Sequence, residues 1–194
     1  MTNGNTLMES ESPDPAQSRV RYLYLVVLVA AVGGFLFGYD LSLISGAIIF
    51  LKAEFELTPF WMGAVAGSAI LGCAAGPLAG VWLADTLGRK RTLMLSSLLF
   101  LGSTIGCALA GSIAELSVWR FIGGMGVGLA STVSPMYIAE IAPAHLRGRL
   151  VVVNQLAIVI GLSMSVFITY LLSFGGHWRW MFATQGVPVM CLMI

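Results

Sequence analysis

The stretch RFIGGMGVGLASTVSPMYIAEIAPAHLRGRLVVVNQ, residues 120–155, decides the fold. It opens on Arg120 and continues as an apolar, glycine-rich segment that carries no charge until Glu140. A loop with proline and arginine follows, and a second apolar segment then begins that contains Asn154 and Gln155. This pattern predicts two membrane-crossing helices joined in a hairpin, with polar groups at both ends and inside.

The composition of the whole chain is that of a membrane protein. Hydrophobic residues make up 58% of the 194 residues and charged residues only 10%, whereas about 25% of a typical soluble domain is charged. We therefore expect an all-α integral membrane protein rather than a soluble domain. Cys73, Cys107 and Cys191 each lie alone in an apolar segment. Their spacing supports neither a disulfide framework nor a metal site.

Apolar segments long enough to cross a bilayer recur along the chain, since a crossing helix needs about 17–25 residues. We expect five complete spans, at 22–51 (with Asp40 inside), 59–84, 92–114, 121–139 and 150–176. A sixth span begins at Met181 and has only fourteen residues, Ile194 included. We therefore expect a fragment that is truncated within its sixth helix.

The beginning of the chain has nothing to bury. Residues 1–20 are rich in Ser, Pro, Asn and acidic residues, which predicts a disordered tail. The expected division is thus a tail at 1–20 and a transmembrane unit at 21–194. A signal peptide is the alternative for the first span, but the span is too long and lacks a convincing cleavage site.

Basic residues alternate between the loops and indicate the topology. They precede the first span and lie between the second and third and between the fourth and fifth, as Arg19, Arg21, Arg89, Lys90, Arg91, Arg147 and Arg149. The other loops carry only Lys52 and Arg179. Because cytoplasmic loops are enriched in Lys and Arg, we expect a cytoplasmic amino terminus, a first helix that runs outward and a fourth that runs inward.

Two charged residues are expected to meet inside the membrane. Asp40 lies eighteen residues beyond Tyr22 on the outward helix, and Arg120 opens the inward helix, so both belong in the outer half of the bilayer at about 1.5 Å per residue. Glu140 is twenty residues past Arg120, roughly 30 Å away, and is excluded as a partner. The alternative for Arg120 is a side chain that extends to the lipid headgroups.

Two cytoplasmic loops share one pattern of charge. Each joins a carboxylate at a helix end to basic residues at the start of the next helix, as Asp85, Gly88 and Arg89 and then Glu140 and Arg147 do. Such groups can pair across loops through charge-assisted hydrogen bonds, which predicts a gating network at the inner face. The alternative is that the basic residues only set the topology, and we favour it for Lys90 and Arg149.

Polar and aromatic residues inside the spans are candidates for ligand contacts. Asn154 and Gln155 could bridge helices or bond a hydroxylated ligand in a cavity. They are adjacent and therefore point about 100° apart, so we expect only one of the two to face the pathway. Phe37, Tyr39 and Trp82 could form an apolar wall for a sugar ring or simply pack. Glycines spaced by four are expected to permit close helix packing; they are Gly72, Gly76, Gly80, Gly102, Gly106, Gly124 and Gly128.

With these motifs in place, the chain resembles the sugar porters of the major facilitator superfamily. The likeness is carried by the fourth-span signature at Ile122, Gly124, Met125, Gly128, Tyr137, Glu140 and Arg147, and by the segments GGFLFGYDLSLISGA, LADTLGRKR, PMYIAEIAPAHLRGRL, NQLAIVIG and HWRWMFA. These blocks occur in the family's order from Tyr22 to the end of the chain. The resemblance implies the amino-terminal six-helix bundle of a twelve-helix transporter.

The resemblance also implies roles for single residues. Asp40 matches the family's proton-binding acid and Arg120 its partner, while Gln155 matches a glutamine that bonds sugar hydroxyls and Phe37 an aromatic of the same site. Two positions depart from the pattern. Val81 stands where the loop motif usually begins with glycine, and Leu162 stands where some proton-coupled members have a second glutamine, which leaves the sugar open.

The function expected from the resemblance is proton-coupled transport of a pentose or hexose across the cytoplasmic membrane by alternating access. An uncoupled facilitator and a non-transporting sugar sensor are the alternatives, and so is a half without activity. We expect no enzyme, because catalytic motifs such as HExxH and GxSxG are missing from the sequence. The expected partners are a sugar, the lipid bilayer and the carboxy-terminal half, with no nucleic acid, metal or cofactor beyond the proton, and a monomeric transport unit.

Overall fold

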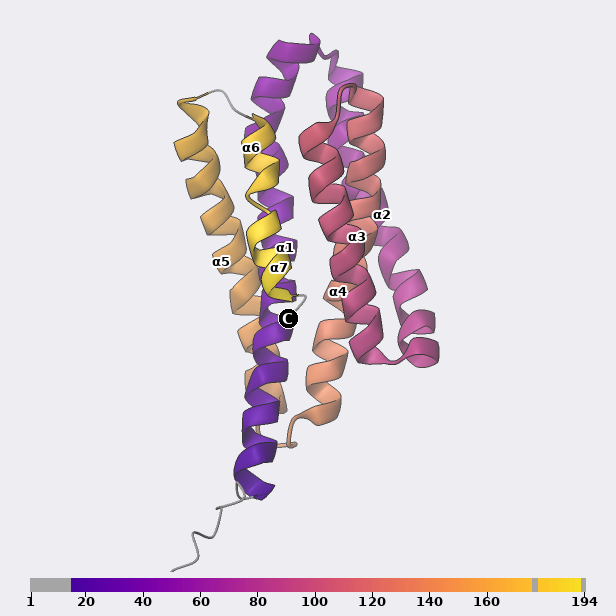
Figure 1. Ribbon diagram of the computed structural model, residues 1–194, viewed down its shortest axis with the longest axis vertical. Helices are drawn as coiled ribbons and strands as arrows, with labels where there is room; N and C mark the ends of the chain where they lie inside the picture. Colours follow the sequence, from indigo (N-terminus) through magenta and orange to yellow (C-terminus); the bar gives the residue numbers. More distant parts are fainter. Residues whose placement is uncertain (1–14, 176–177, 193–194) are drawn as a thin grey trace, which may run out of the picture.

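The computed structural model describes residues 15–175 and 178–192, with side chains for 26–175 and 178–190. Within these residues the chain is helical and has no strand (Figure 1). The helices are α1 (Pro15–Phe55), α2 (Pro59–Leu87), α3 (Arg89–Leu109), α4 (Ile113–Ile141), α5 (Arg147–Ser173), α6 (Trp178–Ala183) and α7 (Gly186–Leu192).

The five long helices α1 to α5 are each long and apolar enough to cross a membrane, which confirms the five predicted spans. The first helix differs from the expectation at its start, since α1 begins at Pro15 rather than at Tyr22. Proline is well tolerated in the first turn of a helix because its missing N–H would have no partner there. The remainder of the expected tail, residues 1–14, lies outside the described residues.

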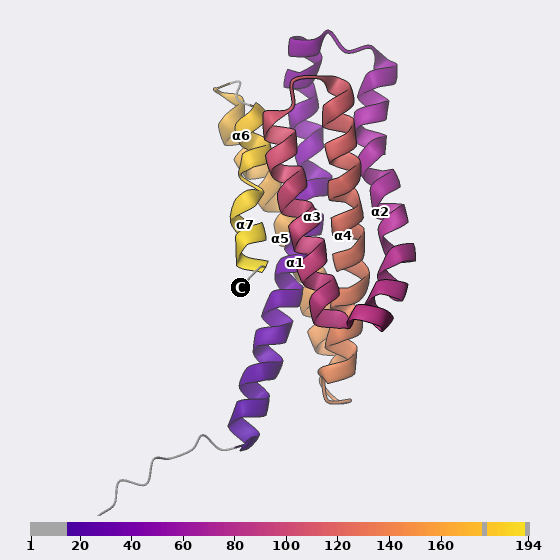
Figure 2. The same cartoon turned by 45° about the vertical axis from the view of Figure 1, so that its right-hand side comes forward.

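The sixth span is divided rather than continuous. Helices α6 and α7 follow one another along the side of α1 (Figures 1 and 2), and Thr184 and Gln185 form a turn between them. Pro188 explains part of this break, because it has no N–H for the carbonyl of Thr184 four residues earlier. That carbonyl instead accepts from the N–H of Val187 at 3.4 Å. The sequence gives no expectation of this turn.

The tightest helix pairs are α2 with α4, α1 with α5 and α3 with α4. Glycines on α2 and α4 face one another as predicted: a Cβ at Gly124 would collide with the carbonyl of Ala69, and one at Gly76 would lie 2.7 Å from the carbonyl of Met125. Gly102 does not fit the expectation, because a Cβ there would meet open space. Its position on α3 points away from the neighbouring helices.

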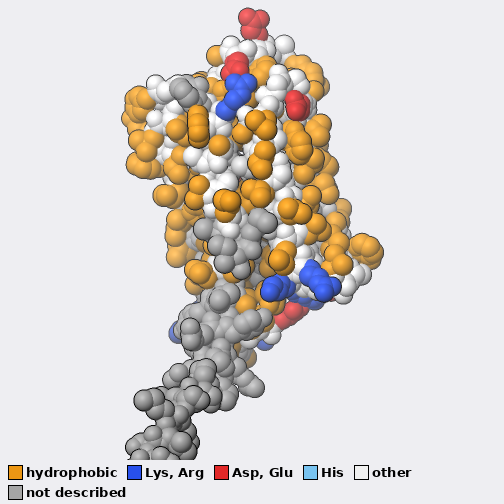
Figure 3. All heavy atoms as spheres, viewed as in Figure 1, with side chains coloured by type: hydrophobic (Ala, Val, Ile, Leu, Met, Phe, Trp, Pro, Cys, Tyr) orange, Lys and Arg blue, Asp and Glu red, His pale blue; other side chains and the backbone are white. Residues whose placement is uncertain are grey.

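Apolar side chains cover much of the outer surface, and charged side chains gather at its two ends (Figure 3). Burial differs strongly between the helices. In the 18-residue apolar stretch of each helix that could cross a membrane, 56% is buried inside the bundle for α4 and 17% for α5. The centre of the bundle is therefore α4, and α5 presents most of its surface outward.

Candidate functional site

The two charged side chains predicted to meet inside the membrane form an ion pair. Arg120 on α4 donates from Nη1 to Oδ1 of Asp40 on α1 at 2.6 Å. Both residues are buried, with 4% and 5% of their surface exposed. The predicted contact between α1 and α4 is therefore present, and Arg120 does not extend to a helix end.

The pair has a third member that sequence reasoning missed. Gln185 donates from Nε2 to the same Oδ1 of Asp40 at 2.8 Å and is itself 3% exposed. Beside it, the hydroxyls of Tyr39 and Thr184 are hydrogen-bonded at 2.7 Å. A signal was available, because Gln185 is a lone amide between two apolar segments of the sixth span. A buried amide needs a partner.

The guanidinium of Arg120 also has an aromatic neighbour. Its Cζ lies 5.8 Å from the centroid of the Phe182 ring on α6, within the range of a cation–π interaction. Its Nε finds no hydrogen-bond partner among the described residues. Arg120 is thus held by one carboxylate and one ring, and it does not use its full capacity of five N–H donors.

The candidate sugar contacts Phe37 and Gln155 lie on α1 and α5, respectively. Gln155 is exposed on α5, whereas its neighbour Asn154 is 6% exposed and packs against Gly34. Phe37 is half-buried and packs at the edge of a cluster around Leu36. No hydrogen bond joins Gln155 to another described side chain. The two neighbours therefore differ in burial, since Asn154 packs between α5 and α1 and Gln155 is exposed; that Gln155 faces the transport pathway stays a prediction.

Two of the aromatic residues considered for the ligand wall lie elsewhere. Tyr39 is 1% exposed because its ring fills the space between α1 and the turn at Thr184. Trp82 is 69% exposed on α2. Of the three aromatic residues, only Phe37 is half-buried.

Arg89 is the centre of the charged cluster at one end of the bundle. Its guanidinium bonds both oxygens of Glu140 at 2.9–3.2 Å, Oδ1 of Asp85 at 2.8 Å and the carbonyl of Ala84 at 2.6 Å. Gly88 connects α2 to α3 with φ +86°, a conformation that glycine adopts readily. The cluster thus ties the α2–α3 turn to the end of α4.

Arg147 does not belong to this cluster as we expected. It is exposed at the start of α5 and makes no ion pair with a described residue. The contact with Glu140 is made instead by Arg89, which bonds both of its oxygens. Of the five residues predicted for the gating network, the structure brings together Asp85, Gly88, Arg89 and Glu140.

A second cluster at the opposite end of the bundle was not predicted. Glu54 near the end of α1 accepts hydrogen bonds from the indole N–H of Trp178 and from Nη1 of Arg179, the latter at 3.2 Å. The Arg179 guanidinium lies 4.4 Å from the centroid of the Trp178 ring. This cluster attaches α6 to α1.

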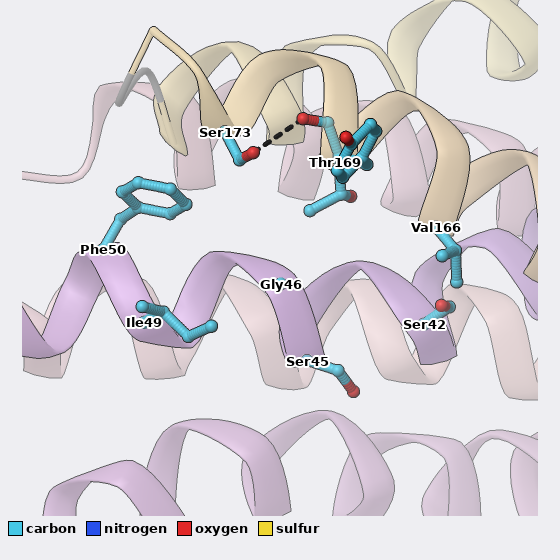
Figure 4. A pocket seen from close by; sticks show the side chains of 9 residues that line it. Ser42, Ser45, Gly46, Ile49, Phe50, Val166, Thr169 and Ser173 are labelled. Carbon is cyan, nitrogen blue, oxygen red and sulfur yellow. Dashed lines mark hydrogen bonds between the residues drawn. The ribbon is translucent and has the colours of Figure 1, made fainter.

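A cavity of about 340 Å³ lies between α1 and α5 (Figure 4). It is lined by Ser42, Ser45, Gly46, Ile49, Phe50, Val166, Thr169, Tyr170 and Ser173. The Thr169 hydroxyl is buried without a partner among the described residues, while Ser173 bonds the carbonyl of Tyr170. Its α1 residues, from Ser42 to Phe50, lie between Asp40 and Glu54 along that helix.

Comparisons with known proteins agree with this geometry. The family model "Sugar (and other) transporter" matches residues 26–194. The glucose transport protein of Synechocystis sp. is 39% identical over 93% of this chain, and the D-xylose-proton symporter of Escherichia coli is 35% identical over 89%. The chain spans 42% of the length of each of these relatives.

A solved structure extends the likeness to three dimensions. The proton:xylose symporter XylE of the major facilitator superfamily, bound to 6-bromo-6-deoxy-D-glucose, superposes with a TM-score of 0.84 at 35% identity. The match covers 90% of this chain and 44% of that one.

Proposed function

Because the chain belongs to the sugar transporter family of the major facilitator superfamily, we propose that it is the amino-terminal half of a proton-coupled sugar transporter. The transporter takes up a pentose or hexose across the cytoplasmic membrane by alternating access. Two of its relatives are named as a glucose transport protein and a D-xylose-proton symporter. The chain spans 42% of their length, so the experiments below use the full-length transporter.

The observation that carries the proposal is the buried pair of Asp40 and Arg120, 2.6 Å apart. An uncoupled transporter has no need for a carboxylate in this position, where desolvation makes a charge costly. A proton that binds Asp40 removes its charge and with it the main attraction to Arg120. The two halves then rock around a central site, as alternating access requires.

Sugar binding in this proposal uses the side of α5 that presents Gln155. An exposed amide on an apolar helix has both a donor and an acceptor for sugar hydroxyls, and Gln155 is exposed on the helix with the least buried surface of the five. Phe37 on α1 contributes an apolar wall to the same site. The carboxy-terminal half supplies the opposite side.

The gating network lies at the cytoplasmic end in this proposal, with the amino terminus on the same side. The basic residues of the α2–α3 turn and the α4–α5 loop support this orientation, because cytoplasmic loops are enriched in Lys and Arg. Asp85, Gly88, Arg89 and Glu140 close the inner face, and Arg147 is free to pair with the other half. The transport unit is a monomer in the lipid bilayer, and it needs no cofactor, metal or nucleic acid.

The decisive experiment is Asp40→Asn in proteoliposomes that contain the full-length transporter. We expect the variant to lose uphill sugar accumulation driven by a proton gradient and to keep sugar exchange, because asparagine fills the same space but cannot take up the proton. Glu56→Gln, at the turn between α1 and α2, is the control for loss of an acid elsewhere.

The outcomes separate the candidate functions. Full proton-driven accumulation by Asp40→Asn would refute the coupling role of Asp40. Downhill transport by the unmodified protein without proton movement would favour an uncoupled facilitator. Sugar binding without any transport would favour a sensor on the same fold.

A further inference from the structure

We propose that the cavity between α1 and α5 is a second binding site, which takes one neutral monosaccharide apart from the site at Gln155. That the ligand is a sugar rests on the proposed function, whereas the site itself rests on the cavity. Its volume of about 340 Å³ lies within the range of small-molecule pockets, roughly 300–1,000 Å³. Thr169 lines it, is 7% exposed, and has a hydroxyl without a hydrogen-bond partner among the described residues.

Unpaired hydroxyls distinguish this cavity from the other helix contacts. Serine and threonine inside a helix can donate to a carbonyl of the preceding turn, as Ser68 and Thr132 do. Ser42 and Ser45 on α1 and Thr169 on α5 all line the cavity and make no hydrogen bond with a described residue. A buried hydroxyl without a partner is costly, and a hydroxylated ligand would supply that partner.

The packing of α1 against α5 fixes the position of the Thr169 side chain. Thr169 projects from α5 toward Gly46 of α1 (Figure 4), and a Cβ at Gly46 would collide with Cγ2 of Thr169. The heavy atoms of a threonine side chain are placed by χ1 alone, which is stiff in a β-branched residue. The contact that holds the methyl group therefore also holds the hydroxyl, so the polar group of the site is preorganised.

The other lining residues indicate the chemistry of the ligand. None of the nine residues that line the cavity is charged, so an ionic ligand would lose hydration there without a counter-charge. Hydroxyl groups both donate and accept hydrogen bonds, which matches the hydroxyls of a sugar. Phe50, Tyr170, Ile49 and Val166 add apolar surface for the C–H groups of a sugar ring. The lining thus suits a neutral polyol better than an ion or a purely apolar molecule.

The cavity lies on the side of α5 that presents Gln155, but at a different depth. Val166 is eleven residues beyond Gln155, about three helical turns, and Ser173 is eighteen residues beyond it, five turns. All three therefore point to nearly the same side of α5, with Val166 about 16 Å and Ser173 about 27 Å along the helix from Gln155. One monosaccharide cannot occupy both positions, so the cavity is a separate site.

The test uses a thiol introduced by Val166→Cys into the full-length transporter. Val166 lines the cavity and is 60% exposed, so the thiol reports on occupancy without the loss of a hydroxyl. Its alkylation is followed by mass spectrometry of its peptide, with D-xylose, D-glucose, L-arabinose and D-galactose as probes. We expect at least one of these sugars to slow alkylation several-fold, also when Gln155→Ala is combined with Val166→Cys. The anion D-gluconate should give no protection.

Thr169→Val removes the buried hydroxyl and keeps the shape of the side chain. In the Val166→Cys protein it should raise the sugar concentration that halves the alkylation rate by about fivefold, because one hydrogen bond to the ligand is lost. Ser45→Ala removes an exposed hydroxyl of the same cavity. It should shift that concentration in the same direction, and it tests the site even if Thr169→Val does not fold.

Thr104→Val is the matched control. Thr104 is a buried threonine of α3 that does not line the cavity, and its hydroxyl donates to the carbonyl of Phe100 in its own helix. We expect this variant to leave protection by sugar unchanged.

The outcomes distinguish the second site from the site at Gln155 and from the proposed function. Protection that disappears with Gln155→Ala, or that neither Thr169→Val nor Ser45→Ala weakens, would overturn the inference. So would equal protection by D-gluconate, or no protection by any of the four sugars. The alkylation assay needs no transport. An unmodified transporter that moves none of these sugars in proteoliposomes would therefore refute the proposed function, while protection of the thiol would still support the site.

Discussion

A buried ion pair such as that of Asp40 and Arg120 is costly to assemble and more costly to break. Each charge loses its hydration, and the attraction between the two offsets that cost only with good geometry and further hydrogen bonds. Here the further bonds are few: one from Gln185 to the carboxylate and one ring contact to the guanidinium. An interaction so sparsely supported is suited to change with one proton.

Gln155 offers a direct test of the sugar site. Gln155→Ala should weaken sugar binding by about 1–3 kcal/mol, because a buried hydrogen bond to the ligand is lost. Isothermal titration of the purified full-length transporter measures the change. Ser163→Ala, also exposed on α5 but bonded to the carbonyl of Val159 in its own helix, is the control. Unchanged binding in Gln155→Ala would exclude Gln155 from the sugar site.

Whole helices meet in this bundle through backbone contacts as much as through side chains. On α2 and α4, glycines remove the side chains that would hold the helices apart, and the backbone of one helix contacts the other. Such contacts suit a membrane interior, where helix association depends on close packing rather than on a hydrophobic driving force. The α2–α4 pair is therefore expected to be intolerant of even a methyl group.

Gly124→Ala tests this intolerance. The added Cβ would collide with the carbonyl of Ala69, and because that atom is backbone the helices must separate, at a cost of about 1–3 kcal/mol. We expect a lower melting temperature in detergent. Gly102→Ala adds the same methyl group where nothing lies within 4 Å, so it should leave the melting temperature unchanged or raise it. Equal melting temperatures for both variants would contradict the account.

The bundle as a whole carries an ion cluster at each end, with the buried pair between them. The cluster around Arg89 joins the α2–α3 turn to α4, and the cluster around Glu54 joins α1 to α6. Exposed ion pairs contribute little to stability, about 0–1 kcal/mol. That small energy fits the proposed function, in which the cluster around Arg89 opens and closes during a transport cycle.

Glu140 and Arg89 should act as one unit in this opening. Glu140→Gln and Arg89→Gln should each increase the alkylation rate of a cysteine introduced at the end of the bundle that carries Arg89, because either change releases the same contact between the α2–α3 turn and α4. The double variant should show no further increase. Additive rates would mean that the two residues act independently and would contradict a shared gate.

The depth of the buried residues was predictable from the sequence, because the position of a residue along a helix follows directly from its number in the chain. The rise per residue and the alternation of basic loops placed Asp40 and Arg120 at the same depth, and their contact is present. The ion-pair partners of charged residues in the loops were less predictable. Arg89 rather than Arg147 meets Glu140, and only the folded loops decide which basic residue is within reach.

The sequence by itself determined five membrane spans, the depth of the two interior charges and the family. Only the tertiary structure shows that the sixth span divides at Thr184 and Gln185, that Gln185 contacts Asp40, and to which side of α5 Gln155 points. The physical reason is that lipid and neighbouring helices are equally apolar. The sequence of a helix that is hydrophobic on all sides therefore predicts its length and depth in the membrane. It does not predict which neighbour each side chain faces.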